Sequence, residues 1–294
     1  MARRRHRKSK SKGPFHQAAH RLLKYPPAWL SLLVLLALIL VAGLAPHIAP
    51  YSPYKLVAKP ILAPQASHLL GTDAVGRDIL SRIIYGARVS LSIGFFSALI
   101  SLAAAIPLAL IVGTIGGIVE ALIMRFTDGL LAFPTIIIAL AVVSVVRPTI
   151  LTISMAISIA FFPRLLRLIR SEVLIVAKSD FVEAARAIGS PYLRILFHTI
   201  LPNITSPILV GFAVYFATAI LMEAGLSFLG FGVAPPTPTW GFMISQGLVY
   251  LRAAPWFSVA PGFAIFIAAL ALNRFGDALR DVLDPRILIG GGLE

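Results

Sequence analysis

The sequence predicts an all-α polytopic membrane protein with about six transmembrane helices. Hydrophobic residues make up 58% of the 294 positions and charged residues only 13%, whereas a soluble domain has about 45–50% apolar and about 25% charged residues. The mean hydropathy is +0.90, so there is too little polar surface to cover a particle in water. Long uncharged runs support the same fold class, because about 20 apolar residues span a bilayer.

A basic tail, residues 1–27, precedes the first uncharged run at 28–45. Nine of the 26 Lys and Arg residues come before Tyr25, and a basic segment in front of an apolar run holds an N-terminus in the cytoplasm. The net charge of +14 is therefore assigned to contacts with anionic membrane lipid, and no nucleic-acid partner is expected. The run is long for a signal peptide and more spans follow, so we interpret it as an uncleaved anchor.

Five more uncharged runs give the remaining spans. The run at 89–119 would form about 46 Å of helix at 1.5 Å per residue. We therefore expect it to project beyond the bilayer or to end near Gly113, Gly116 and Gly117. The other runs are 129–146 (starting near Met124), 148–163 (continuing to about Ile169), 199–222 and 253–273.

Small residues recur at four-residue spacing in the second span. One line is Ser90, Gly94 and Ala98, and a second is Ser97, Ser101 and Ala105. Such lines let helices approach closely in lipid, so close packing is expected, although the pattern does not identify the partner helix.

Basic residues are distributed asymmetrically across the expected membrane. With the N-terminus inside, 19 of the 26 lie on the cytoplasmic side and seven outside. This distribution obeys the positive-inside rule, so both termini are predicted to be cytoplasmic. The expected segments are the tail 1–27, the first span with an outer segment 28–88, a core 89–282 that contains a cytoplasmic loop 180–202, and a cytoplasmic C-terminus 283–294.

A second outer segment, 230–252, begins with a cluster of prolines that a lipid-exposed helix would not tolerate. Aromatic residues in and after this segment are expected to anchor at the membrane interface, because their rings are amphipathic. They are Trp240, Phe242, Tyr250 and Trp256.

The composition argues against chemistry by this chain itself. There is no cysteine, which excludes disulfides and thiolate sites. His16 and His20 have a spacing that can hold a metal, but no further ligand is near and a solvated tail is the better interpretation. No Gly-Lys dipeptide occurs, so there is no P-loop. We expect no catalytic residue, no metal site and no cofactor bound by this chain.

The loop 180–202 is expected to contain two short helices. Asp180 is a suitable N-cap for the first, and Glu183 can complete a capping box. Gly189 occupies the position of a left-handed C-cap.

The second helix of this loop is expected to start at Ser190 and Pro191, since a cap residue followed by proline is typical of a helix start. Pro202 should end this helix or kink it into the next span. On these grounds alone, an amphipathic surface helix and a stiff element that transmits force to two spans remain equally plausible.

The loop resembles the EAA loop of ABC-importer permeases. Glu183-Ala184-Ala185 is followed after three residues by Gly189 and, ten residues later, by Ile200-Leu201-Pro202. In that family the loop docks into a cleft of the ATPase subunit and couples nucleotide-driven closure to permease motion. The resemblance therefore implies that the ATPase-coupling residues are Glu183, Ala184, Ala185, Arg186, Gly189, Ile200, Leu201 and Pro202.

The resemblance extends over most of the chain from Leu69 onward. The segments 70–94, 224–244 and 276–286 are similar to the C-type subunit of the dipeptide/oligopeptide/nickel permease branch. The turn at 116–120 departs from this pattern, since relatives often have an aromatic-rich stretch there.

This resemblance implies an ABC-importer type I permease arrangement, in which the chain pairs with a second homologous permease subunit to form the translocation path. Two ATPase subunits would bind ATP and Mg on the cytoplasmic side, and a solute-binding protein would deliver the substrate from outside. The expected location is the cytoplasmic (inner) membrane of a bacterium or archaeon.

Peptides are the expected substrate, with nickel or another small solute as the alternative. An ion-coupled secondary transporter would need buried acidic or histidine relays and usually repeated halves, and neither is visible in the sequence. A structural membrane-assembly protein is the third hypothesis.

Four charged residues outside the loop are also candidates. Arg77 with Asp73 or Asp78 is expected to form an outer gate or a contact for the solute-binding protein; no ligand cluster supports a metal or nucleotide site there. Glu223 lies in an otherwise uncharged region, and an intramembrane acid is a functional candidate, here for the translocation path. The alternative for Glu223 is a structural pair with Arg88 or with a neighbouring subunit.

Overall fold

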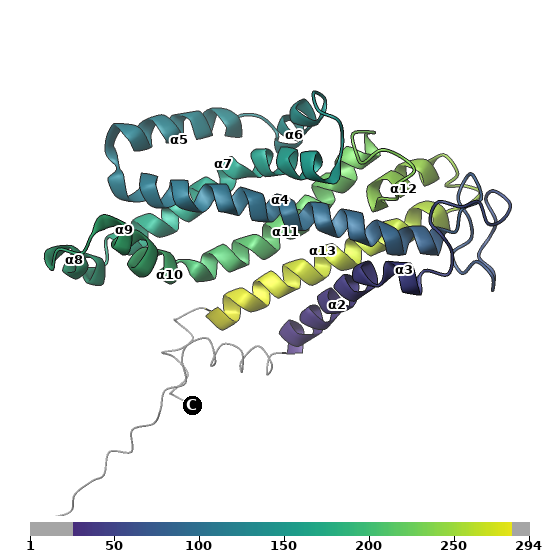
Figure 1. The fold of residues 1–294 in the computed structure, drawn as a ribbon, viewed down its shortest axis with the longest axis horizontal. Coiled ribbons are helices and arrows are strands. Elements are labelled where there is room, and N and C mark those ends of the chain that lie inside the picture. Colours follow the sequence, from purple (N-terminus) through teal and green to yellow (C-terminus); the bar gives the residue numbers. More distant parts are fainter. Residues whose placement is uncertain (1–25, 284–294) are drawn as a thin grey trace, which may run out of the picture.

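The computed structural model describes residues 26–283, so the predictions for most of the basic tail and for nearly all of the C-terminal segment fall outside the described residues. Within this range the chain forms a long helical bundle without extended strands (Figure 1). The elements are α2 (Pro26–Gly43), α3 (Ala45–Ile48), α4 (Ile79–Ile115), α5 (Gly117–Leu131), α6 (Thr135–Val143), α7 (Ile150–Ala177), α8 (Asp180–Ala187), α9 (Tyr192–Arg194), the π-helix η1 (Ile195–Ile200), α10 (Leu201–Asn203), α11 (Thr205–Phe228), α12 (Trp240–Leu248) and α13 (Trp256–Leu283).

Six apolar segments of the described region match the expected number of spans. Four helices, α4, α7, α11 and α13, are long and apolar enough to cross a membrane. The helices α5 and α6 meet the same criteria together, with a bend of 88° between them. The sixth segment, α2, has 18 residues, which is near the lower limit for a span. The predicted all-α polytopic architecture is confirmed.

The third span differs from the expected continuous helix. It begins at Gly117 rather than near Met124, and the helix stops at Leu131 before restarting at Thr135. Pro134 accounts for the break, because proline lacks an N–H and disfavours helical geometry in the residue before it. An uncharged run therefore located this span without revealing its bend.

The longest helix, α4, has 37 residues and starts ten residues before the uncharged run. Asp78 caps it by accepting a hydrogen bond from the Ser81 backbone N–H at 2.8 Å. The helix ends at Ile115, and Gly116 follows with a φ of +68°. The helix thus ends at the predicted glycines, and at about 55 Å its 37 residues also exceed the bilayer core of about 30 Å, so both expected alternatives hold.

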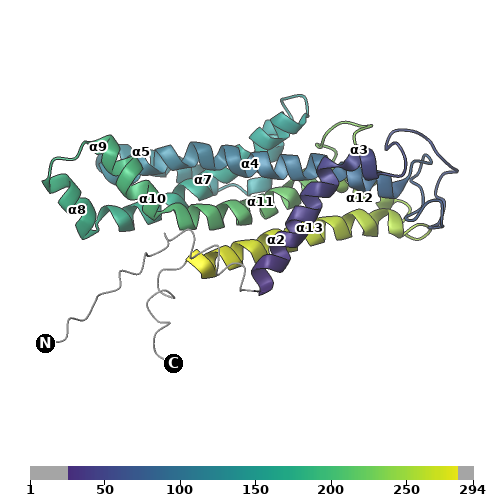
Figure 2. The same cartoon turned by 60° about the horizontal axis from the view of Figure 1, so that its bottom comes forward.

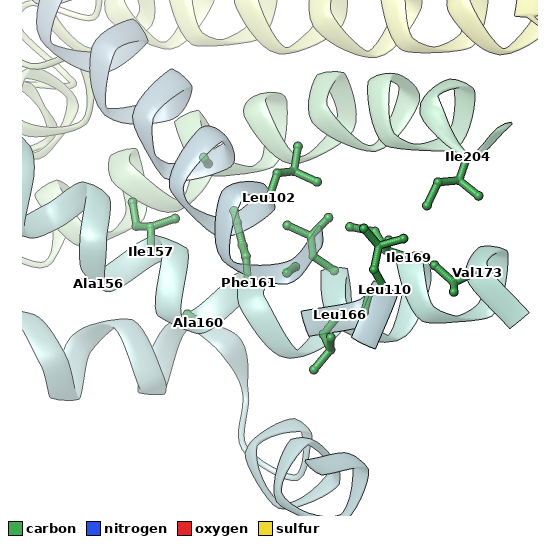
Figure 3. Close-up of a cluster of buried hydrophobic side chains, with 14 of the residues drawn as sticks. Leu102, Leu110, Ala156, Ile157, Ala160, Phe161, Leu166, Ile169, Val173 and Ile204 are labelled. Carbon is green, nitrogen blue, oxygen red and sulfur yellow. The ribbon is translucent and has the colours of Figure 1, made fainter. Parts of the chain in front are cut away.

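The main core lies where α4 packs along α7 and against α11 (Figures 1 and 3). Leu110 of α4 and Leu166 and Ile169 of α7 are among the buried residues that fill it (Figure 3). Glycines permit the close approach of α4: a Cβ on Gly94 would lie 2.7 Å from the Cγ1 atom of Ile220 in α11. The small-residue line through Gly94 thus packs against α11.

The N-terminal helix α2 lies at the edge of the bundle against α13 and α4, and Figure 2 shows it crossing α13. Its outward side carries large exposed apolar residues, among them Leu33, Leu36, Ile39 and Leu40. Such a surface is stable in lipid but not in water, as expected for a peripheral span.

The two ends of the bundle differ. We call the end with α8 and α9 the inner end, and the end with residues 49–78 and α12 the outer end (Figures 1 and 2). At the outer end, Trp240 is only 1% exposed, and its indole Nε1 donates to the Ile83 carbonyl at 3.0 Å. The expectation that Trp240 anchors at the membrane interface is therefore wrong; it is part of the core.

Candidate functional site

The short helix α8 at the inner end is seated on the core by one face. Val182 is fully buried and belongs to the core cluster formed by α4 and α7, and Ala185 packs against the same cluster. The opposite face, with Glu183, Ala184 and Arg186, is exposed. The EAA residues thus lie on a helix that is anchored on one side and open on the other.

The N-terminus of α8 does not form the predicted capping box. The N-cap is Ser179, and its side chain makes no capping bond; its hydroxyl donates to the Val176 carbonyl at the end of α7 (2.6 Å). Asp180 and Glu183 both fall in the first turn of α8, where carboxylates favour the positive end of the helix dipole.

The C-terminus of α8 confirms the predicted glycine cap. Gly189 has a φ of +76°, its N–H donates to the Arg186 carbonyl (2.9 Å), and the Ser190 N–H donates to the Ala185 carbonyl (3.0 Å). This is the hydrogen-bond pattern of a Schellman motif. A Cβ at Gly189 would meet nothing within 4 Å, so backbone conformation alone accounts for the glycine.

After the glycine the chain returns to α11 through a broken helical path. The second helix begins at Tyr192 with Pro191 as its N-cap, one residue later than expected. A π-helical turn, η1, follows and ends just before α10, which contains Pro202. Since proline has no N–H to continue the hydrogen-bond ladder, the local change in helical geometry agrees with the predicted kink.

The returning path is fixed to the core by buried side chains. Ile195, Leu196, Ile200 and Ile204 are all at most 5% exposed and belong to the cluster of α4 and α7, whereas Leu201 is only half-buried and Pro202 is exposed. The whole loop is therefore continuous with the packing of the spans, and it cannot move independently of them without exposing apolar surface.

Large apolar side chains remain exposed on the other side of this loop. Ile188 is 82% exposed and Leu193 is 66% exposed, and Phe181, Tyr192 and Phe197 are 44–49% exposed. They lie at the extreme inner end of the bundle, on or beside α8, α9 and η1 (Figure 2). A cluster of exposed apolar residues among polar ones marks a surface that contacts another protein or the membrane.

The candidate residues Asp73 and Arg77 at the outer end form an ion pair inside the subunit and are not part of an exposed surface. Asp73 is fully buried; its carboxylate accepts from Arg77 Nε at 2.7 Å and from the Arg77 and Val75 backbone N–H groups. Buried Arg82, which the sequence did not single out, has its Nε 3.5 Å from the same carboxylate. Asp73 is thus not accessible to a binding protein in this structure.

Asp78 has a similar internal role. It is 1% exposed, caps α4, and has its Oδ1 3.0 Å from Nδ1 of His68, which is also buried. The sequence suggested that Asp73 and Asp78 lie on the surface. Their burial could not be predicted, because the loop 49–78 has no hydrophobic periodicity that would show which of its residues face inward. The expected contact with a binding protein is not available to the Asp78 carboxylate.

Glu223 lies inside the subunit and joins three helices. Its carboxyl accepts hydrogen bonds from the hydroxyls of Ser90 in α4 (3.0 Å) and Ser227 in α11 (2.6 Å). Thr239, the N-cap of α12, donates to the Ser227 hydroxyl at 3.3 Å. Each of these side chains is 0% exposed.

The predicted pair of Glu223 with Arg88 is not present in the described region: Arg88 is exposed, and hydroxyl groups satisfy the carboxyl instead. Because the side chain is enclosed by its own subunit, it does not line an open path here. Ser90 was visible in the sequence as part of a small-residue line, but only the structure shows that it serves Glu223.

No group of three or more potential metal ligands occurs in the described part of the chain. The inner end is thus a helical segment that is packed on the core by one face and has an exposed apolar face on the other.

Two family descriptions match the sequence. Residues 105–289 match the family "Binding-protein-dependent transport system inner membrane component", and residues 13–66 match "N-terminal TM domain of oligopeptide transport permease C". The fold is similar to that in a structure of the MetNI methionine ABC transporter, with a TM-score of 0.55 and 14% identity over 67% of this chain and 96% of that one.

Several characterised proteins are similar over nearly their full length. A dipeptide transport system permease protein DppC of Alkalihalophilus pseudofirmus is 40% identical over 93% of this chain and 90% of its own. A di/tripeptide transport system permease protein DppC of Pseudomonas aeruginosa is 41% identical, with 87% of each chain covered. A glutathione transport system permease protein GsiD of Shigella flexneri is 40% identical over 93% and 91%. The chain therefore belongs to the family of binding-protein-dependent transport system inner membrane components, the permease subunits of ABC importers.

Proposed function

We propose that this chain is the C-type permease subunit of an ATP-driven peptide importer, and that the loop 180–202 is the docking site of its ATPase. The observation that carries the proposal is the two-sided character of this loop. Val182 and Ile200 fix it to the core, while Ile188 and Leu193 offer apolar surface at the inner end.

The mechanical argument follows from the packing. Side chains of the loop belong to the same buried cluster as those of α4 and α7, and protein interiors are packed too densely to absorb a displacement locally. A push on α8 by a partner is therefore passed to the spans. The Schellman motif at Gly189 keeps α8 and the returning helix at a fixed angle.

The proposed partners follow from family membership. A second, homologous permease subunit completes the path, two ATPase subunits bind ATP and Mg and hydrolyse ATP, and a solute-binding protein docks outside. This arrangement requires the inner end and both termini to be cytoplasmic, which the excess of basic residues expected on that side supports.

Peptides are the proposed substrate class. The similar permeases quoted above are named for dipeptides, di/tripeptides and glutathione, and glutathione is itself a small peptide. The test is ATP-driven uptake of a radiolabelled dipeptide into proteoliposomes that contain the complete complex and its binding protein.

The docking site is tested with charged substitutions on its exposed face. Ile188→Asp and Leu193→Asp change side chains that are mostly solvent-exposed, so the subunit should insert and fold normally. Loss of an apolar interface anchor weakens binding by about tenfold or more, and we expect ATPase to be lost from the purified complex, together with uptake. Uptake at the wild-type rate in the double variant would refute the docking role.

The absence of native cysteines provides a direct contact assay. With a cysteine placed on the ATPase cleft, Ile188→Cys and Arg186→Cys should cross-link to it. Val182→Cys is the matched control on the same helix, because Val182 is fully buried and should not react. Equal cross-linking at all three positions would indicate that α8 is not seated as described.

A further inference from the structure

A groove whose lining includes charged residues opens between α7 and α11 on the surface of the subunit. It encloses a cavity of about 740 Å³, and Arg164, Tyr215, Thr218, Glu172 and Arg280 are among its lining residues. None of these residues was assigned a role by the sequence, and none belongs to the loop 180–202.

Two polar groups of the groove, Arg164 and Tyr215, lie about halfway along α7 and α11. Arg164 lies 14 residues after Ile150 and 13 before Ala177, so it is about 20 Å from either end of α7 at 1.5 Å per residue. Tyr215 lies 10 residues after the start of α11 and 13 before its end, and its ring packs edge-on against Phe161, with centroids 5.3 Å apart. Both polar groups therefore lie near the middle of their helices, and Arg164 is the first charged residue of α7 after the uncharged run that begins it.

The exposed face of α7 changes character at Arg164. Toward the outer end it is apolar, with Leu151, Met155 and Ile159 each 45–57% exposed. From Arg164 toward the inner end the exposed positions include Arg167 and Ser171. Leu168 and Ile175 are exposed there as well, so this half is mixed. Its charged side chains need water or a polar partner.

Arg164 differs from the other arginines of this face in having no partner. Within residues 26–283, Arg167 forms an ion pair with Asp128, and Arg170 forms one with Glu120, whereas Arg164 is exposed and has no ion pair. A guanidinium binds carboxylates through two parallel hydrogen bonds. An arginine without an ion pair beside a cavity of this size is thus suited to bind an anionic group of a solute.

We propose that this groove is the subunit's wall of the translocation path, and that Arg164 binds the C-terminal carboxylate of the passing peptide. Tyr215 and Thr218 line the same groove. The Tyr215 hydroxyl can donate to a peptide carbonyl, and the Thr218 hydroxyl, which donates to the Val214 carbonyl at 2.8 Å, can accept from a peptide N–H. A single guanidinium is enough to receive the carboxylate and still release it, as transport requires. The proposal rests on the proposed function, and it names a substrate contact within it.

The first test compares two arginines of the same helix in the complete importer, reconstituted with its ATPases, second permease and binding protein. Arg164→Gln should lower the uptake of a dipeptide by about tenfold or more, since a charge-assisted hydrogen bond is lost, while Arg164→Lys retains much of it. Arg167→Gln, the matched control, removes the same charge from outside this groove and should transport normally. Wild-type uptake by Arg164→Gln overturns the inference.

A second arm separates a substrate contact from a contact with the other permease. Uptake of a dipeptide and of its C-terminal amide is measured for Arg164→Gln and expressed relative to wild type for each substrate, so that any preference of the binding protein cancels. We expect the deficit to be confined to the free acid. An equal deficit for both substrates makes Arg164 a structural partner and refutes the inference.

A third arm guards against a variant that fails to assemble. Arg164→Cys should be inactive, and the cysteine should be reached by water-soluble methanethiosulfonates. A reagent that adds an aminoethyl group should restore uptake of the free acid, and a neutral methyl reagent should not. Lack of labelling, or equal effects of the two reagents, refutes the inference. If wild type itself shows no peptide uptake, the proposed function fails instead.

Discussion

The hydrogen bond between Ser90 and Glu223 gives a stability prediction with a built-in control. Ser90→Ala removes a hydroxyl that donates to the Glu223 carboxyl at 3.0 Å and accepts from the Trp240 backbone N–H at 3.3 Å. Both partners are fully buried or nearly so, so neither can form a replacement hydrogen bond with water. The substitution leaves two polar groups without this partner and creates little new volume.

The cost can be worked from these contacts. Leaving a buried polar group unsatisfied costs about 1–3 kcal/mol, and the Glu223 carboxyl retains its bond to Ser227, so we take about 2 kcal/mol in total. For a protein of this size each kcal/mol lowers the melting temperature by about 2–4 °C. The expected fall is therefore about 4–8 °C.

The control is Ser101→Ala on the same helix. Ser101 is also 0% exposed, but its hydroxyl has no hydrogen-bond partner within the described residues. Replacing it with alanine should leave the melting temperature unchanged or raise it. The assay is thermal unfolding of the detergent-solubilised subunit, followed by fluorescence-detected size exclusion. Equal melting temperatures for the two variants would refute the hydrogen-bond assignment.

Three further outcomes follow from the structure. Gly94→Val should destabilise the subunit by about 1–3 kcal/mol through overpacking, because its Cβ would lie 2.7 Å from an α11 side chain. Gly129→Val is the control, since a Cβ there would meet nothing within 4 Å and no overpacking is expected. Thermal unfolding of the two variants distinguishes these outcomes. Gly189→Ala should weaken ATP-coupled uptake, because alanine in the left-handed backbone conformation of Gly189 costs about 1–2 kcal/mol. Gly189→Asn should retain most of the wild-type uptake, because asparagine tolerates that conformation. Equal uptake by the two variants would contradict this explanation. Asp128→Asn should shift the melting temperature by less than about 3 °C, because its ion pair with Arg167 is about half-exposed.

The sequence determined the features that depend on local composition. Uncharged runs indicated the spans because solvent preference is a property of each residue, and the glycines after α4 and α8 indicated helix ends because few other residues adopt positive φ. Sequence also located the EAA loop, since its pattern occupies one short continuous segment. The details of its caps were less predictable: the Ser179 hydroxyl bonds backward to α7 instead of capping α8.

Only the tertiary structure decided what the charged residues do. Asp73 and Asp78 were candidates for an outer gate or a binding-protein contact, and Glu223 for the translocation path. Each is buried and satisfied by groups within the subunit. The partners of Glu223 come from α4 and α11, more than 130 positions apart, and no local pattern encodes such a contact. Arg164 shows the reverse case, because it looked like one of several basic residues in a cytoplasmic segment. Its proposed role depends on the cavity beside it and on the absence of an ion pair within residues 26–283. These are properties of packed helices rather than of neighbours along the chain.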